Sequence, residues 1–296
     1  MEILPGIHRI ESDLGVRVMC QYLLIGEDRT MLVDTGLATT PDEVIIPYLE
    51  EIGLSLEGVD EIIISHADLD HCGGNRALKQ KHPGLRFSCG EWDRAYVESN
   101  RTMLAELYCW SEPYGFGPDE EMKASILADL GGDCPVDTGL RGGETFRLGP
   151  GWRVEALHLP GHTMGHLGIW DARNDAAIII DAALESGIYD REGNRLIPPR
   201  YFDAGLYRKT LRALRSMRPE HLLTAHYPPM RGREALDFLD RSLEFTDRVE
   251  EVVREGLEKG VTDLRGLTEL ADERLGPYPE MPAEIGAGVR AHMAEF

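Results

Sequence analysis

The sequence lacks the segments that carry a chain into or across a membrane. It begins MEILPGIHRIESDLG, without a basic stretch followed by an apolar one. No later run approaches the ~20 uninterrupted apolar residues that a bilayer-spanning helix needs. We therefore expect a soluble, cytoplasmic protein with no membrane role.

Cysteine is scarce and irregularly spaced. The chain has five cysteines, none in C-x-x-C spacing: Cys20, Cys72, Cys89, Cys109 and Cys134. An odd, scattered set disfavours a disulfide framework and fits free thiols in a reducing compartment. Cys72 alone lies beside the candidate site described below, and we interpret it as a packing residue rather than a ligand.

Basic residues are few relative to acidic ones. The chain has 31 Lys and Arg against 52 Asp and Glu, which gives a net charge of −21. The resulting field repels phosphate backbones and disfavours a nucleic-acid partner. Segment 261–276 has a pattern like a helix-turn-helix, but residues 231–296 hold 9 basic against 16 acidic residues. A small neutral or cationic substrate fits this charge better, although bound metal ions would reverse its sign locally.

The apolar periodicity predicts an α/β fold. Short apolar runs predict strands at residues 18–25, 30–33 and 61–65. Apolar residues at helical spacing predict helices at residues 41–52 and 76–81. Because strands and helices alternate, we expect a layered domain, and 296 residues with 42% hydrophobic content suffice for a large core.

Two parts of the chain depart from this alternation. Residues 88–135 predict a helical insertion rich in aromatic side chains, which either cover a pocket as a lid or pack in a core. Residues 231–296 predict a helical C-terminal appendage that begins with a long helix at 233–259. We therefore divide the chain into a catalytic domain, residues 1–230, and this appendage. The long helix packs either on its own domain or on a partner chain, which leaves a homodimer open.

The densest chemical signal is the stretch SHADLDHCGG at residues 65–74, directly after a predicted buried strand. Within six residues it holds four groups suited to metal binding, namely His66, Asp68, Asp70 and His71. Imidazole nitrogens and carboxylate oxygens are ligands that zinc, manganese and iron accept. The alternative interpretation is a polar loop in which Asp70 caps the helix that follows.

Three further candidates lie at strand ends far along the chain. His162 follows the apolar segment 152–159, Asp181 closes the run 176–180, and His226 closes the run 222–225. A side chain in this position lies at a sheet edge, where several strands converge on one site. His166 lies four residues after His162, and we interpret it as structural.

In this order the residues resemble the motifs of the metallo-β-lactamase fold superfamily, over about residues 7–230. The resemblance adds Asp34, which ends another predicted strand, as the first motif. It implies an αββα sandwich that binds two divalent ions, with Zn²⁺ favoured over Mn²⁺ or Fe²⁺. One ion would be held by His66, Asp68 and His162, and the second by Asp70, His71 and His226. Asp181 would bridge both ions, and Asp34 would orient a ligand histidine through a hydrogen bond.

The main departure from the family pattern is Asp68, which stands where a second histidine is usual. Either its carboxylate still binds the first ion, or its shorter reach leaves it behind the ligands and weakens that site. Two smaller departures are Ile180, where a glycine often precedes the bridging aspartate, and Tyr227, where glycine is frequent. Neither removes a ligand.

The resemblance to lactonase and glyoxalase II-like branches implies a hydrolase. A metal-bound hydroxide would attack the carbonyl of a small ester, lactone or thioester, so no serine nucleophile is needed and none of the G-x-S-x-G type is present. Asp70 is the candidate proton relay to the leaving group, and the candidate substrate-binding residues are Tyr189, Tyr201 and Tyr227. The alternative is a non-haem iron oxidoreductase of the persulfide dioxygenase type, which the carboxylate of Asp68 keeps open.

Overall fold

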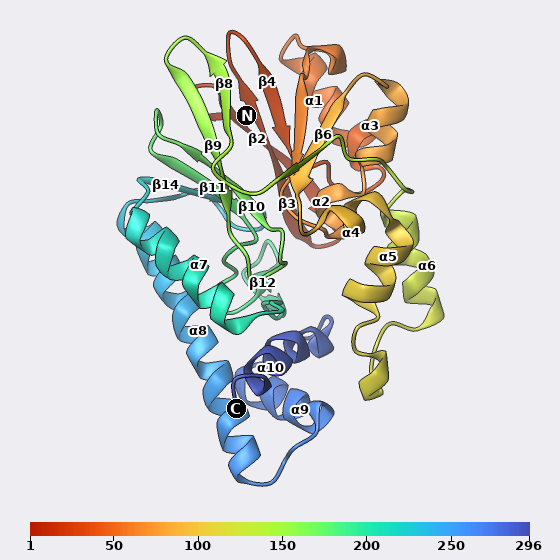
Figure 1. Cartoon of the computed structure of the whole chain (residues 1–296), viewed down its shortest axis with the longest axis vertical. Helices are drawn as coiled ribbons and strands as arrows, with labels where there is room; N and C mark the ends of the chain where they lie inside the picture. Colours follow the sequence, from red (N-terminus) through yellow and green to blue (C-terminus); the bar gives the residue numbers. More distant parts are fainter.

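The computed structural model describes residues 1–296 and contains two mixed β-sheets that face each other, with helices on their outer faces (Figure 1). The first sheet has seven strands in chain order: β1 (Glu2–Leu4), β2 (Ile7–Leu14), β3 (Arg17–Ile25), β4 (Thr30–Val33), β5 (Glu61–Ile64), β6 (Arg86–Gly90) and β7 (Thr138–Leu140). The second has six strands, ordered β15 (Met230–Arg231), β14 (His221–Thr224), β11 (Ala176–Ile180), β10 (Leu167–Asp171), β9 (Trp152–His158) and β8 (Thr145–Gly149).

Alternation along the strands explains why both sheets are covered on two faces. In β4, Met31 and Val33 pack between the sheets, whereas Leu32 packs against the helices on the outer face. In β11, Ile178 packs between the sheets and Ile179 packs against α7 (Ala204–Met217). Strands buried on both faces read as continuous apolar runs. This layering confirms the predicted αββα sandwich.

Helices cover the outer face of each sheet. The helical elements between β4 and β6 are η1 (Pro41–Ile45), α1 (Ile46–Glu51), η2 (Leu56–Gly58), α2 (Leu69–Cys72) and α3 (Asn75–Lys81). The second sheet is covered by α7 and α8 (Arg233–Glu258). Helix α7 begins where the Asp203 carboxylate accepts a hydrogen bond from the Leu206 amide at 2.7 Å, a normal N-cap.

The segment between β6 and β7 is mostly helical. Its elements are α4 (Arg94–Glu98), α5 (Asn100–Met103), η3 (Leu104–Tyr108), η4 (Glu112–Tyr114) and α6 (Glu120–Asp129). The sequence left open whether its aromatic side chains pack in a core or cover a pocket, and the structure contains an example of each. Trp110 is buried in a cluster with residues of α8 and α9 (Leu264–Leu275), Tyr108 lines the pocket described below, and Trp92 is exposed.

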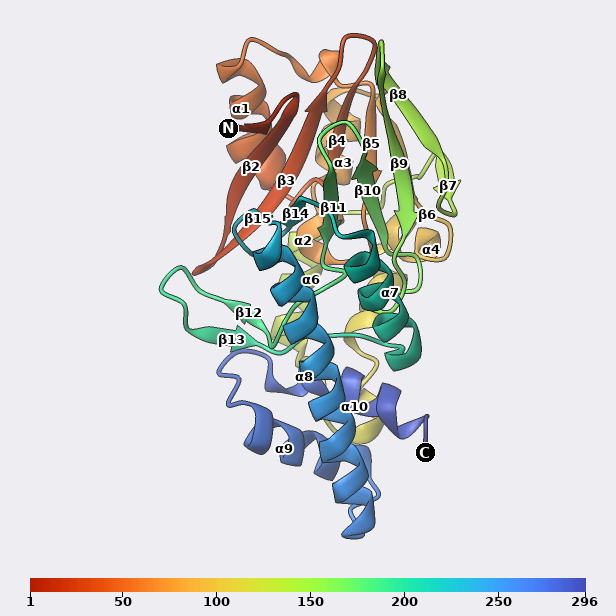
Figure 2. The same ribbon diagram turned by 90° about the vertical axis from the view of Figure 1, so that its left-hand side faces the viewer.

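The C-terminal segment is helical and lies below the sheets in Figure 1. After α8 and α9 come η5 (Pro282–Glu284) and α10 (Ile285–Met293). Segment 261–276 forms the single helix α9 rather than a helix-turn-helix. A two-stranded hairpin, β12 (Ile188–Tyr189) and β13 (Arg195–Ile197), lies beside the loop between α9 and α10 (Figure 2).

Two simpler observations complete the fold. None of the helices is both long enough and apolar enough to span a membrane. All five cysteines are free thiols, as the sequence predicted, and four of them are buried.

Candidate metal centre

The predicted strand-end residues converge at one edge of the two sheets. Asp34 follows β4 directly and His66 follows β5 after one residue, while Asp181 follows β11 directly. His226 lies just beyond β14 and His162 lies in the loop between β9 and β10. Asp68, Asp70, His162, Asp181 and His226 line one pocket, which is closed by Met281 and Glu284 of the C-terminal segment.

Four histidines in this centre are fixed through their Nδ1 atoms. His71 Nδ1 donates to Asp34 Oδ2 at 2.9 Å, and His66 Nδ1 donates to Ser65 Oγ at 2.9 Å. His162 Nδ1 donates to the carbonyl of Arg200 at 2.7 Å, and His226 Nδ1 donates to that of Val18 at 2.8 Å. Each ring therefore keeps its Nε2 lone pair for the interior of the centre, as metal-binding histidines do.

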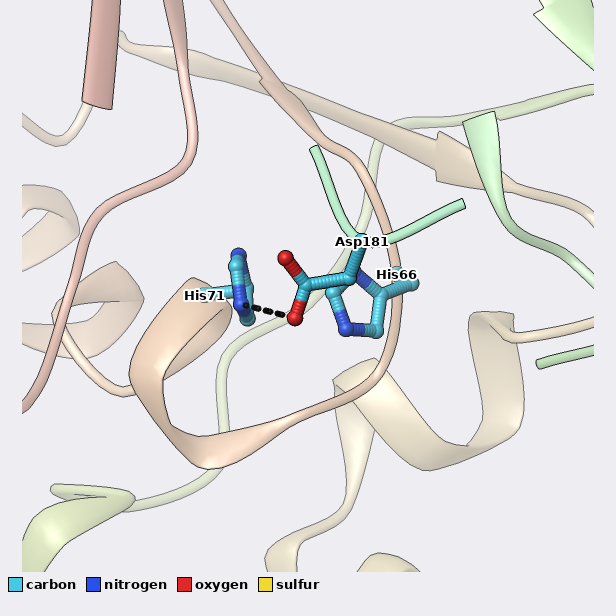
Figure 3. A group of neighbouring side chains, drawn as sticks. All are labelled: His66, His71 and Asp181. Carbon is cyan, nitrogen blue, oxygen red and sulfur yellow. Dashed lines mark ion pairs between the residues drawn. The ribbon is translucent and has the colours of Figure 1, made fainter. Parts of the chain in front are cut away.

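Several polar atoms of the centre are buried without a hydrogen-bond partner. They are His66 Nε2, His71 Nε2, His162 Nε2 and Asp181 Oδ1. Buried polar atoms are rarely left unpaired, so this concentration indicates a missing electrophilic partner. Figure 3 shows the Asp181 carboxylate between the rings of His66 and His71, with Asp181 Oδ2 3.5 Å from His71 Nε2.

Carboxylates make one half of the centre strongly negative. Asp70 Oδ2 lies 3.5 Å from both His71 Nε2 and His226 Nε2, and Asp181 Oδ2 lies 3.2 Å from His226 Nε2. Burial alone would lower the pKa of His71, but the carboxylates of Asp70, Asp181 and Asp34 outweigh it and raise the pKa well above 6.5. The centre thus attracts positive charge, which a divalent cation would supply.

The candidate ligand atoms form three groups, in each of which all atoms lie within 4.8 Å of one another. The groups are His66, Asp68 and His162; Asp70, His71 and His226; and His66, His71 and Asp181. They reproduce the two predicted sets and the central place of Asp181. Histidine nitrogens with carboxylate oxygens suit zinc, manganese or iron, so the residues fit a pair of such ions. Ion binding by each residue stays a prediction.

Strained backbone marks two of these strand ends. Asp34 has φ 65° and Ile180, which precedes Asp181, has φ 50°. Residues other than glycine avoid this left-handed region, and a β-branched residue there costs roughly 1–2 kcal/mol. A glycine, which is frequent at this position in the family, adopts this conformation without strain. Ile180 instead gains the burial of its side chain and accepts a strained backbone.

Asp68 is held more firmly than the sequence suggested. It is the N-cap of α2, since its Oδ1 accepts from the Leu69 amide at 2.9 Å, so the predicted cap falls on Asp68 and not on Asp70, which lies within the helix. The Tyr108 hydroxyl also donates to Oδ1, and the Arg200 guanidinium pairs with Oδ2. Burial raises the pKa of Asp68, but Arg200, His162 and the Tyr108 hydrogen bond together outweigh burial, and the net pKa is lowered.

The Asp68 oxygen that pairs with Arg200 also faces the first group of ligands. This oxygen, Oδ2, lies 4.0 Å from His66 Nε2 and 3.9 Å from His162 Nε2. Oδ1 already accepts two hydrogen bonds, from Leu69 and Tyr108, so a cation would bind through Oδ2, which it would share with the Arg200 guanidinium. The pattern alone could not reveal Arg200 or Tyr108, since both lie in segments without a motif.

Asp93 joins the two loops that carry the histidines. It is fully buried, and its carboxylate accepts from the Ala67 amide at 3.1 Å and the Gly165 amide at 2.6 Å, as well as from the Thr163 hydroxyl at 2.5 Å. Burial raises the pKa of Asp93 against these hydrogen bonds. This residue fixes residues 66–71 relative to residues 162–166, and no sequence signal singled it out.

The three candidate substrate-binding tyrosines do not line the pocket. Tyr201 is fully buried and its hydroxyl contacts His292 Nε2 at 2.9 Å. Tyr227 donates to the carbonyls of Leu184 and Gly187, both at 2.6 Å, and the Tyr189 hydroxyl contacts that of Ser186 at 2.8 Å. The tyrosine in the pocket is Tyr108.

His166 and Cys72 lie beside the centre without joining its ligand groups. The ring of His166 stacks on that of His66, with centroids 4.6 Å apart, and burial lowers its pKa well below 6.5. Cys72 packs in the outer core and its Sγ donates to the carbonyl of Asp68 at 3.1 Å. Both positions agree with the structural interpretation.

Comparison with known proteins agrees with this geometry. Hydroxyacylglutathione hydrolase GloC of Haemophilus influenzae is 29% identical over 170 residues, which are 57% of this chain and 68% of that protein. An uncharacterized protein, YobT of Bacillus subtilis, is 26% identical over 168 residues, 56% of this chain and 63% of that one.

Solved structures share the fold over nearly the whole chain. A metallo-beta-lactamase family protein from Thermus thermophilus superposes with a TM-score of 0.74 at 21% identity, covering 98% of this chain and 93% of that one. A beta-lactamase domain protein from Burkholderia ambifaria gives 0.69 at 18% identity, covering 99% and 86%. The family described as the metallo-beta-lactamase superfamily matches residues 16–226. The chain therefore belongs to the metallo-beta-lactamase superfamily.

Proposed function

We propose that the protein is a metal-dependent hydrolase that cleaves a small ester, lactone or thioester. The observation that carries the proposal is the cluster of three buried, unpaired imidazole nitrogens and one unpaired carboxylate oxygen, beside a pocket that His162 and Asp181 line. Divalent ions bound there would acidify a water molecule and polarise a carbonyl group. No serine or cysteine nucleophile lines the pocket, so the chemistry rests on these ligands.

The surrounding residues orient the ligands and handle the proton. Asp34 and the carbonyls of Arg200 and Val18 hold the imidazole rings so that each Nε2 faces inward. Asp70 lies between His71 and His226 and also faces the pocket, so its carboxylate is placed to pass a proton to a leaving group.

The pocket wall supports a small organic substrate. Beyond the centre it is lined by apolar side chains, among them Leu14, Leu69, Leu184, Ile188, Ile197 and Met281. An apolar wall around a few polar groups is the usual form of a small-molecule site. The Haemophilus relative is named as a hydroxyacylglutathione hydrolase, and this name supports hydrolysis of an acyl group by this chain as well.

Metal removal tests the proposal. Protein treated exhaustively with a chelator should lose turnover of p-nitrophenyl acetate, a γ-lactone and a simple thioester, and Zn²⁺ or Mn²⁺ should restore it. The variant Asp181→Asn should fail to recover on metal addition, because the central carboxylate is lost. Full activity in metal-free protein would contradict the proposal.

A second function is favoured by one observation. His66, Asp68 and His162 form a group of two histidines and one carboxylate, the donor set of many non-haem iron oxygenases. An oxidoreductase of the persulfide dioxygenase type would contain iron after aerobic purification and consume oxygen with a thiol-derived substrate. Zinc content without oxygen uptake would dismiss it.

A further inference from the structure

Both arginines that line the active-site pocket are neutralised by glutamates from the C-terminal segment. Arg17, at the start of β3, has its Nε 3.6 Å from Glu280 Oε2. Arg200 has its Nη1 3.5 Å from Glu284 Oε2. The residues that line the pocket include no lysine and no third arginine.

The loop that carries these glutamates is fastened in place over the pocket. The Glu280 amide donates to the carbonyl of Leu196 in β13 at 3.1 Å. The Tyr278 hydroxyl donates to the carbonyl of Ser186 at 2.9 Å, next to β12. Figure 2 shows the β12–β13 hairpin beside this loop, and Met281 at its centre contributes to the pocket wall.

The two ion pairs differ in their exposure. The side chain of Glu284 is 12% exposed and that of Arg200 is 8% exposed, whereas the side chain of Glu280 is 42% exposed. Solvent screens the outer pair and leaves the inner one strong. Arg200 also pairs with Asp68, so two carboxylates oppose its single charge.

Apart from the proposed metal ions, an anionic substrate group would therefore find no unpaired cationic side chain on the pocket wall. A carboxylate entering beside Arg200 would meet Glu284, Asp68 and Asp70 and would have to displace a buried glutamate. Like charges placed together in a buried site are strongly disfavoured. A neutral acyl group meets only the apolar wall.

We propose that Glu280 and Glu284 are specificity-determining residues that reserve the pocket for uncharged acyl substrates and exclude those with a carboxylate near the scissile bond. The proposal rests on the proposed hydrolase function. It narrows the substrate class: a thioester whose acyl chain ends in a carboxylate, such as a glutaryl thioester, would be a poor substrate beside a neutral acyl thioester of the same length.

Two matched esters test the selectivity in metal-loaded protein. p-Nitrophenyl pentanoate is neutral, and mono-p-nitrophenyl glutarate has the same chain length with a terminal carboxylate. Wild type should prefer the neutral ester by about tenfold or more in kcat/KM. In Glu284→Gln that ratio should fall by about tenfold, mainly through KM for the anionic ester, and in Glu280→Gln by about threefold because the outer pair is screened.

The control removes the same charge elsewhere. Glu244 is exposed on α8 and forms no ion pair, so Glu244→Gln should leave the ratio at the wild-type value. An unchanged ratio in Glu284→Gln and in the double variant with Glu280→Gln would overturn the proposal while hydrolysis itself continued. Should Glu284→Gln fail to fold, the exposed Glu280→Gln and Glu280→Arg carry the test, and an unchanged ratio in both would count against it.

A binding measurement separates this proposal from the reaction itself. Calorimetric titration with pentanamide and with glutaramate, its analogue with a carboxylate end, needs no turnover. The measured quantity is the affinity for glutaramate divided by the affinity for pentanamide. This ratio should be about tenfold higher in Glu284→Gln than in wild type. Failure of both esters to react, with this shift present, would refute the hydrolase and keep the charge selectivity. Absence of the shift would refute the selectivity alone.

Discussion

Arg200 pairs through its guanidinium with the carboxylate of Asp68, while its backbone carbonyl accepts a hydrogen bond from His162 Nδ1 at 2.7 Å. One residue thus positions two of the three groups proposed to hold the first metal ion. This arrangement explains how a carboxylate can replace the usual histidine. The guanidinium compensates the added negative charge and pairs with the same carboxylate oxygen, Oδ2, that is directed at His66 and His162.

Metal content tests Asp68 directly. Asp68→Ala should lose about one equivalent of metal per chain relative to wild type, because the first ligand group would keep only two histidines. Elemental analysis of purified protein gives the number. Tyr108→Phe is the matched control, since it removes a hydrogen bond to Asp68 but keeps the ligand, and its metal content should not change. Equal content in Asp68→Ala and wild type would place Asp68 outside the ligand set.

Asp34 should control metal affinity without binding the ion. Its carboxylate accepts from the Ser65 amide at 2.7 Å, the Ser65 hydroxyl at 2.8 Å and His71 Nδ1 at 2.9 Å. Asp34→Asn suits the left-handed backbone but weakens the hold on His71, so metal affinity should fall about 10–100-fold. Competition with a chromogenic chelator measures it. Ser65→Ala, which removes one of the three bonds, should lose less, and wild-type affinity in Asp34→Asn would disprove the orienting role.

At position 180 the glycine variant should be more stable than the alanine variant, which is the reverse of the usual order. Both Ile180→Ala and Ile180→Gly leave a cavity and should cost about 2–5 kcal/mol, because the side chain is fully buried. At φ 50°, however, glycine escapes a penalty of about 1–2 kcal/mol that alanine keeps, so the glycine variant should be the more stable. Urea denaturation measures both. Ile178, buried in the same strand, is the control, and there alanine should be the more stable.

Only one thiol should react readily in the native protein. Burial raises the pKa of Cys20 to about 12 and that of Cys134 to about 11, and it raises those of Cys72 and Cys89 as well. Cys109 alone is partly exposed. Ellman's reagent at pH 8 should therefore titrate about one thiol in folded protein and all five after denaturation. If folded Cys109→Ser still reacted rapidly with Ellman's reagent, a thiol other than Cys109 would be accessible and the prediction would be wrong.

His292 should contribute to stability at neutral pH and lose that contribution in acid. Its Nε2 accepts from the Tyr201 hydroxyl at 2.9 Å, and burial, aided by Arg208, lowers its pKa below 6.5. The unfolded chain then binds the proton more readily, so the contribution is complete above about pH 6.5 and shrinks below it.

The matched variant is His292→Gln. At pH 8 it should be destabilised by about 1–3 kcal/mol through the loss of a buried hydrogen bond. The difference from wild type should narrow toward pH 5, as measured by thermal denaturation at each pH. A constant difference across this range would mean that the pKa of His292 is not lowered.

The sequence predicted a layered α/β domain and the strand-end residues from local patterns, and the resemblance to the metallo-β-lactamase fold superfamily added the αββα sandwich. Strand β11 is apolar throughout, β4 and β5 are apolar after their first residue, and a polar residue follows each where the strand ends. The pattern of apolar residues and the position of the polar residue after it are enough to predict such strands and their ends. The helical segment 233–259 was likewise placed within a residue of α8.

The remaining site residues depend on tertiary contacts that no pattern records. Arg200 and Asp68 are separated by 132 positions, and the loop with Glu284 closes the pocket from another segment. The alternative interpretation placed a helix cap at Asp70, whereas the cap is Asp68, because the boundaries of short helices are poorly marked in a sequence. The tyrosines were selected by nearness to motifs in the chain, and the fold turned Tyr201 into the core instead.

The position of Asp93 sets a limit for engineering the helical segment that follows it. Since Asp93 binds both histidine loops, and Arg94 and Glu98 bind the backbone of Val136, the two ends of this segment are locked to the catalytic scaffold. Between these ends the segment also packs against the first sheet, and the Ala38 amide donates to the carbonyl of Asp129 at 2.8 Å; its core residues are Met103, Leu107, Ile126, Leu130 and Cys134. A chimera that imports another segment here should therefore be spliced inside those limits and keep these apolar positions, so that the scaffold beneath stays covered.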